Sequence, residues 1–262
     1  MKQTMSLPKN FIEKIKRLIE TSYQIAKTEF KLKNEGSYLG IFWYLLNPIL
    51  TFILLFLIFK DRLGVNIPFY ALYLLIGIVM FNFFQSSTLE ATRVIRDYRY
   101  VIKSINFPKE SLIISIILKN LFSHFFEIIL VSIVMVFLKV EVDRIFYYPL
   151  AFLLLTLFSL GVSLFLSSLT VYFVDMENVW QFLVRLIWLA TPIFYSVGGQ
   201  IRLFYLNLLN PMYYYISLAR GFMIDGQISN YIFWGAVIYS IIFLAIGWFL
   251  FNKLKNKFAE LI

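Results

Sequence analysis

The sequence predicts an all-α integral membrane protein with six transmembrane helices. Of its 262 residues, 60% are hydrophobic, whereas a soluble domain is on average less than half apolar. Apolar runs such as 45–59 (LLNPILTFILLFLIF) and 73–84 (YLLIGIVMFNFF) are too extensive for a core of this size to bury. The polar stretches are short, so residues 1–262 are predicted to form a single transmembrane domain.

Six segments have the length and composition of membrane spans. A helix crosses the ~30 Å hydrocarbon layer with about 20 mostly apolar residues. The candidate spans are 41–59, 69–88, 111–138, 148–171, 179–197 and 231–251. The segments outside them are an N-terminal segment (1–35), a loop (89–110), an irregular region (198–230) and a tail (252–262).

The distribution of lysine and arginine predicts the orientation, because cytoplasmic loops carry an excess of these residues. Segments 1–40, 89–110 and 252–262 carry eight, five and three cations, whereas the opposite side carries Lys60, Arg62, Lys139, Arg144, Arg202 and Arg220. Both termini and the 89–110 loop are therefore expected in the cytoplasm. The short loop 172–178 has two acids and no cation, so its charges do not indicate on which side of the membrane it lies.

The N-terminal segment reads as an amphipathic helix. Apolar and charged residues occupy opposite faces, and they are Phe11, Ile12, Ile15, Leu18, Ile19, Tyr23, Ala26 and Phe30 against Lys14, Lys16, Arg17, Glu20 and Lys27. Such a helix typically lies in the membrane interface with its apolar side down. Packing against neighbouring spans is the alternative, and the pattern favours the interface.

The 89–110 loop contains a second amphipathic helix, over about 90–105. Its apolar stripe is Ala91, Val94, Ile95, Tyr98, Val101, Ile102 and Ile105. The helix should stop near Asn106, because the residue before Pro108 disfavours helical geometry. Two interpretations are equally open: a helix resting on anionic lipid, or a docking helix whose charges pair with a cytoplasmic partner. The docking residues would be Arg93, Arg96, Asp97, Tyr98, Arg99 and Lys103.

The 198–230 region contains two apolar pieces, 201–209 and 212–224, that are too short to span. Glycine and proline breaks around them indicate re-entrant half-helices, which are tolerated only where protein or water covers the backbone. Aromatic residues gather here, namely Phe194, Tyr195, Phe204, Tyr205, Tyr213, Tyr214 and Tyr215. They suit either an interfacial aromatic belt or a gate and sugar-stacking surface on the external side.

Polar residues inside the spans are costly and therefore informative. Lys119, His124 and Glu127 share a face of the third span, and Gln181 and Arg185 share a face of the fifth. They are candidate lumen residues. The alternative is buried pairing, for example between Arg185 and Glu127, and for Arg185 that alternative is favoured. His124 is expected to be a hydrogen-bonded helix contact.

No catalytic motif occurs in the sequence. It lacks the phosphate loop GxxxxGK[ST], HExxH and GxSxG. A single histidine and no cysteine leave no ligand set for a metal site of the zinc type. We therefore expect no enzyme activity and no metal or cofactor in this chain.

Six short segments, taken in order, resemble one family. GSYLGIFWYLLNPIL (36–50) is similar to the start of the first span in the membrane subunits of ABC transporters that export bacterial O-antigen, capsule and teichoic acid, with Gly40, Trp43 and Pro48 at matching places. Five further stretches resemble later family segments: FNFF (81–84), VIKSINFPKE (101–110), VDMENV (174–179), TPIFYS (191–196) and LNPM (209–212). One departure is Tyr172-Phe173-Val174, where relatives often carry an arginine before the aspartate.

The resemblance implies a permease that forms a homodimeric channel in the bacterial inner membrane. Two separate ATPase subunits, which bind the ATP and Mg²⁺, would dock on the 90–105 helix as a coupling helix, and the 198–226 half-helices would form the external gate. The substrate would be a lipid-linked polysaccharide. Alternatives are an ABC exporter of drugs or lipids with the same architecture, and an ATP-independent flippase or intramembrane enzyme.

The cation distribution makes a testable prediction of topology. Because the chain has no cysteine, single cysteines can be introduced at Gly64, Val142 and Tyr100 without background. A membrane-impermeant thiol reagent should label positions 64 and 142 in intact cells and position 100 only after permeabilisation. Labelling of position 100 in intact cells would contradict the six-span topology.

Overall fold

The structure, a computed structural model, is all-helical and describes residues 7–35, 42–198 and 200–258. Gly40 and Gly199, and the side chains of Phe11 and Ile12, lie outside the described residues. The described part contains no β-strand. Its helices, in order, are α1 (Leu7–Asn34), α2 (Phe42–Phe59), α3 (Tyr70–Ala91), α4 (Val94–Asp97), α5 (Arg99–Ser104), α6 (Glu110–Phe137), η1 (Val142–Tyr147), α7 (Tyr148–Thr170), α8 (Met176–Ala190), α9 (Ile201–Leu208), α10 (Pro211–Arg220), the π-turn η2 (Gly221–Asp225), α11 (Asn230–Leu254) and η3 (Lys255–Lys257).

Five helical stretches are long and apolar enough to cross a membrane. They are α2, α3, α6, η1 with α7, and α11 with the turn that follows it. The fifth predicted span, 179–197, is instead the 15-residue helix α8 followed by non-helical backbone. At a rise of 1.5 Å per residue it covers only about 22 Å. The expectation of six full-length spanning helices therefore needs correction at this element.

Proline 192 explains why α8 ends early. The residue before a proline is pushed out of the helical region, and Thr191 has extended backbone angles (φ −78°, ψ 135°) directly after Ala190. Helix α5 ends at Ser104, and Ile105 is extended, which is slightly before the stop expected near Asn106.

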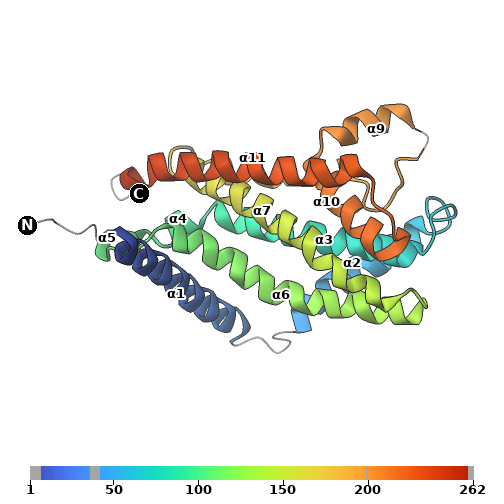
Figure 1. Cartoon of the computed structure of the whole chain (residues 1–262), viewed down its shortest axis with the longest axis horizontal. Helices are drawn as coiled ribbons and strands as arrows, with labels where there is room; N and C mark the ends of the chain where they lie inside the picture. The colour runs from blue at the N-terminus through green and yellow to red at the C-terminus, as the bar shows by residue number, and fades with distance from the viewer. Residues whose placement is uncertain (1–6, 36–41, 199, 259–262) are drawn as a thin grey trace, which may run out of the picture.

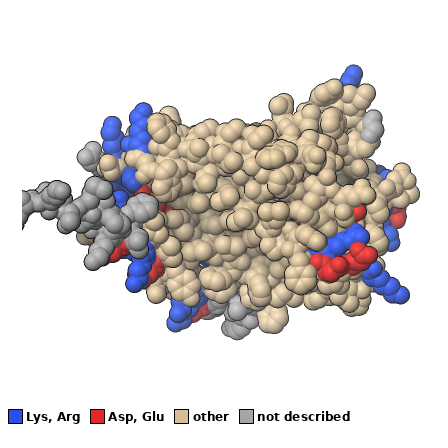
Figure 2. Space-filling model, in the orientation of Figure 1, with Lys and Arg blue, Asp and Glu red and all other residues tan. Residues whose placement is uncertain are grey.

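Different helices form the two ends of the molecule. In Figure 1 the start of α1, the short helices α4 and α5, and the end of α11 lie at the left, whereas α9 and α10 lie at the right. Figure 2 shows that charged residues on this face gather at the two ends, with an uncharged band between them. Such a band is what a bilayer requires, and segments predicted on the same side lie together.

Helix α3 forms the centre of the bundle, and α7 crosses α11 in direct backbone contact. Most of α3 is buried, whereas α2 and α11 are largely exposed. At the crossing, a Cβ on Gly247 would lie 2.0 Å from the carbonyl oxygen of Gly161. A row of small residues, Ser159, Ser163 and Ser167, is fully buried along α7, as is typical of close helix packing.

Two short helices replace a span in the 198–230 region, as the sequence predicts. Asn210 caps α10 by accepting a hydrogen bond from the Met212 amide at 3.1 Å, and Pro211 occupies the first turn. The helix then loosens into the π-turn η2, which ends at Gly226 with φ 67°. Turns of this kind occur often at functional sites.

Candidate functional site

At the α4–α5 end, the chain presents a short helical surface. Val94, Ile95 and Ile102 are buried beneath it, which confirms most of the predicted apolar stripe. The predicted single helix is, however, divided into α4 and α5 at Tyr98, where the backbone leaves helical geometry (ψ 16°). Val101 and Ile105, at the far end of the predicted stripe, are exposed instead.

Two of the six predicted docking residues bind side chains of other helices. Arg96 forms an ion pair with Glu177 of α8 at 2.5 Å, and the Tyr98 hydroxyl donates to Glu29 of α1. The remaining four are exposed: Arg93, Asp97, Arg99 and Lys103. Tyr100 is exposed beside these four residues, and the Arg99 guanidinium stacks on its ring, 4.7 Å from the ring centre.

A chain of ionic contacts connects this surface to the interior. Lys119 of α6 is nearly buried, and its Nζ lies 2.8 Å from Glu90 of α3 and 3.2 Å from Glu29 of α1. Glu29 also accepts the hydrogen bond from Tyr98. Four residues on α1, α3, α6 and the α4–α5 junction are thereby joined, and Lys119 is a buried, paired residue.

The same contacts place the N-terminal helix. Ser22 and Ala26 of α1 are fully buried, and α1 lies along α6 (Figure 1). Ile15, Ile19 and Tyr23 nevertheless remain exposed beside this contact. The helix therefore packs on the bundle and still keeps an apolar strip of the kind that an interfacial helix needs.

His124 and Glu127 also have partners inside the bundle. The imidazole lies between Glu127 (Nδ1 to Oε2, 3.0 Å) and the Tyr148 hydroxyl (Nε2 to Oη, 2.7 Å), and it stacks on Phe152 at 4.0 Å. The prediction of a hydrogen-bonded helix contact is confirmed. The suggested pairing of Glu127 with Arg185 is wrong, because Glu127 faces His124. Among the described residues, no cluster of three metal-ligating side chains occurs.

Only α8 carries its predicted polar residues on an open surface. Gln181 and Arg185 are both exposed, and Glu177 near the start of the same helix is half-buried through its ion pair with Arg96. An exposed arginine in the middle of such a helix is costly in lipid. This face of α8 therefore requires water or another protein surface.

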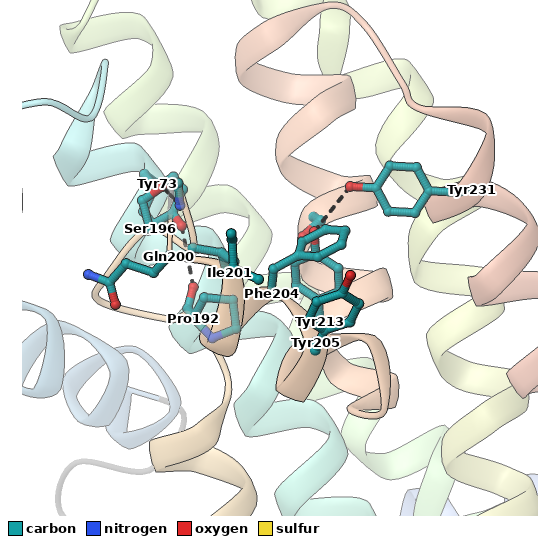
Figure 3. A pocket seen from close by; sticks show the side chains of 12 residues that line it. Tyr73, Pro192, Ser196, Gln200, Ile201, Phe204, Tyr205, Tyr213 and Tyr231 are labelled. Carbon is teal, nitrogen blue, oxygen red and sulfur yellow. Dashed lines mark hydrogen bonds between the residues drawn. The ribbon is translucent and has the colours of Figure 1, made fainter.

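At the opposite end, α9 and α10 cover a cavity of about 540 Å³. Its lining residues come from α3, α9, α10, the start of α11 and the segment 192–200, and they include Tyr73, Pro192, Ser196, Gln200, Phe204, Tyr205, Tyr213, Ser217 and Tyr231. Figure 3 shows Phe204, Tyr205 and Tyr213 close together on one side, with Tyr73, Pro192 and Ser196 on the other. The cavity is thus walled by aromatic rings and edged with hydroxyls and an amide.

The predicted aromatic set divides into cavity and packing residues. Phe204, Tyr205 and Tyr213 line the cavity. Tyr215 is fully buried with its hydroxyl 2.9 Å from Ser240, Tyr214 donates to the Leu208 carbonyl, and Phe194 stacks on Phe59. Tyr195 donates to the Ala190 carbonyl. These four belong to the packed wall.

The predicted aromatic set lacks two aromatic residues of the cavity lining. Tyr73 lies near the start of α3, and Tyr231 near the start of α11, where its hydroxyl lies 3.2 Å from that of Tyr213. Both are tyrosines within two or three residues of the ends of apolar runs, a position that a search for an aromatic belt would have found.

Arg220 organises the backbone beneath the cavity. Its guanidinium donates to the carbonyls of Tyr73 (2.8 Å), Pro192 (2.6 Å) and Ile193 (2.8 Å) and stacks on the Tyr73 ring. Tyrosine hydroxyls satisfy the neighbouring carbonyls: Tyr70 donates to Phe194, and Tyr73 donates to Tyr195, each at 2.9 Å. The non-helical segment after α8 therefore has its carbonyl groups bonded, as backbone at membrane depth requires.

Comparison with known proteins identifies similar chains. The family described as ABC-2 type transporter matches residues 22–224. A protein named O-antigen export system permease protein RfbA from Klebsiella pneumoniae is 28% identical over 244 residues, covering 91% of this chain and 93% of that protein. A protein of the same name from Myxococcus xanthus is 23% identical over 258 residues, covering 94% and 99%.

The Arg220 cluster generates a prediction. Arg220→Met keeps apolar bulk but removes the donors, which leaves the Pro192 and Ile193 carbonyls unsatisfied. Each such group costs about 1–3 kcal/mol, so we expect several kcal/mol less stability and faster thiol labelling of a Val197→Cys probe. Thermal unfolding in detergent gives the first measurement.

The matched control is Arg202→Met, which removes the same charge from an exposed position on α9. It should change stability by less than about 0.5 kcal/mol. Equal stability of the two variants would show that the Arg220 bonds do not hold the segment.

Proposed function

The chain belongs to the ABC-2 type transporter family, and from this premise we propose that it is the membrane subunit of an ATP-driven exporter of a lipid-linked polysaccharide. Two copies would form the channel, and two separate ATPase subunits would supply the energy. The direction of transport would be outward across the bacterial inner membrane. The observation that carries the proposal is similarity over nearly the whole chain to proteins named O-antigen export permeases.

The α4–α5 surface supports docking of the ATPase subunit. Arg93, Asp97, Arg99 and Lys103 are exposed in one short segment, where they are free to pair across an interface. The sequence has no phosphate loop of its own, so ATP and Mg²⁺ would bind to the partner. Tyr98 and Arg96 act differently: their contacts with Glu29 and Glu177 would carry movement of the docked loop to α1 and α8.

The open face of α8 supports a path between two copies. Gln181 and Arg185 would face water or the second chain, which removes the cost of exposing them to lipid. A cationic residue on this path also suits a substrate that carries phosphate. The buried residues Lys119, His124 and Glu127 would support the wall of the path through their bonds within the bundle rather than contact the substrate.

The cavity under α9 and α10 supports a gate that touches sugar. Tyrosine offers a flat apolar face with a polar tip, and a pyranose ring combines an apolar face with hydroxyls at its edge. The rings of Phe204, Tyr205 and Tyr213, with Ser196 and Gln200 beside them, provide both kinds of contact. We propose that the polysaccharide leaves the channel at this cavity.

Docking can be tested by reversing charge on the exposed surface. Arg99→Glu with Lys103→Glu should weaken association with the ATPase subunit by roughly ten-fold, since each exposed interfacial charge contributes about 1 kcal/mol or less and reversal adds repulsion. Co-purification and surface polysaccharide measure the effect. Lys253→Glu with Lys257→Glu alters the same charge at the same end of the molecule and should leave both unchanged. Normal association and export in the docking variant would indicate that the loop rests on lipid.

The gate can be tested at a residue whose loss does not threaten folding. Tyr205 lines the cavity yet is 64% exposed, so Tyr205→Ala should leave stability and assembly intact. Losing one ring contact of about 1–2 kcal/mol should lower the export rate or the affinity for a sugar fragment by roughly ten-fold. Leu209→Ala, at an exposed position outside the cavity lining, is the control. If both variants export equally, Tyr205 belongs to an interfacial belt.

A further inference from the structure

A second cavity, lined by charged residues, lies at the α4–α5 end, and none of the six predicted docking residues lines it. It measures about 520 Å³ and is bounded by the first half of α1, the turn that precedes α6, and the C-terminal end of α11 with η3. Four cations line it (Lys14, Arg17, Lys109 and Lys255), with the two acids Glu13 and Glu110. Its volume lies within the range of small-molecule sites, and the proposed transport function gives it no role.

The positive charges of this cavity are not fully compensated. Glu110 is occupied by an ion pair with Lys255. Lys109 is half-buried and donates to the Lys255 carbonyl at 2.7 Å, but no carboxylate among the described residues lies within ion-pair distance of it. Burial lowers the pKa of Lys109, Lys255 lowers it further, and only the adjacent Glu110 opposes them. An anion beside this ammonium would stabilise its charged form and so oppose the lowering of the pKa by burial and by Lys255.

Arg17 adds unused donors that face the same space. One of its amino groups donates to the Asn106 carbonyl at 3.2 Å, whereas a guanidinium has five N–H donors. Phosphate oxygens are the acceptors that a guanidinium and nearby lysines bind best. The ligand chemistry that fits is therefore a phosphate.

Exposed apolar residues place the cavity at the level of lipid headgroups. Ile15 and Ile19, on the same stretch of α1, are exposed, and so are Trp248 and Phe249, about two turns before Lys255 on α11. Tryptophan is enriched where hydrocarbon meets water. The helices that supply the cavity's cations thus carry exposed apolar side chains within about two turns of it, which would place the cavity at the level of phospholipid phosphates.

We propose that this cavity binds the phosphate of an anionic phospholipid headgroup, held by Arg17 and Lys109 with support from Lys14 and Lys255. Basic pockets between helices on the cytoplasmic side of membrane proteins bind such headgroups. The bound lipid would join three parts of the chain, namely α1, the start of α6 and the C-terminal end of α11. It would be a resident lipid, separate from the transported substrate.

The test uses the purified full-length chain and native mass spectrometry with dioleoyl phosphatidylglycerol, and dioleoyl phosphatidylcholine as the neutral comparison. Arg17→Gln with Lys109→Gln should lower phosphatidylglycerol affinity by about 30-fold, because each cation near the surface contributes about 1 kcal/mol. Lys253→Gln with Lys257→Gln is the control pair, because it removes two cations from the same end of the molecule but outside the cavity. Lys109→Arg keeps the charge and should retain binding, which separates loss of the site from loss of the fold.

Salt concentration distinguishes a cavity from a diffuse surface attraction. At about 1 M salt the screening length falls to about 3 Å. Any effect of the control substitutions at Lys253 and Lys257 on phosphatidylglycerol affinity should then vanish, whereas the effect of the substitutions at Arg17 and Lys109 should persist. Identical behaviour of the two pairs at both salt concentrations would overturn the proposal. Tighter binding of undecaprenyl diphosphate than of phosphatidylglycerol would assign the site to a substrate carrier instead. Loss of ATPase co-purification with unchanged lipid binding would make it a protein contact.

Discussion

The α9–α10 end of the molecule depends on one buried guanidinium. Helix α8 stops at Ala190, and the buried residues Pro192 and Ile193 that follow have carbonyl groups without helical partners. Arg220 supplies donors to two of these carbonyls and to α3. Gly77 makes this possible, since a Cβ there would lie 2.6 Å from the guanidinium. This cluster therefore holds the segment that follows the break at Pro192, and with it one wall of the cavity.

The α4–α5 end is held by ion pairs between side chains of both signs, whereas Arg220 at the other end bonds backbone carbonyl groups. Lys119 forms ion pairs with Glu29 and Glu90, and Arg96 forms an ion pair with Glu177. Removing one partner from a buried pair leaves an uncompensated charge, which costs far more than the pair gains. These contacts therefore fix the positions of α1, α3, α6 and α8 relative to the loop. A partner bound to the loop would act on four helices at once.

Local rules predicted most of the helices, because hydrophobic period, proline and cation counts are local properties. The exception at 179–197 was also local: Pro192 was available in the sequence, and the apolar run beyond it was counted as helix. Contacts between side chains distant in the sequence could not be predicted from such local rules. Nothing in the spacing of Lys119 indicates Glu29, 90 residues earlier, and nothing near Tyr73 indicates Tyr213. Such contacts depend on how the helices pack, so the sequence revealed which residues were unusual without revealing their partners.

The crossing of α7 and α11 limits how this protein can change shape. With Gly247 facing the Gly161 carbonyl and no side chain between them, the two helices can neither slide nor rotate past each other without a clash. They form one rigid body, joined by the Ser240 hydroxyl bond to the Leu154 carbonyl. Any transition between an open and a closed form must therefore bend the chain elsewhere. The non-helical residues 171–175 and 226–229 flank this body, so bending at either segment would leave the crossing intact.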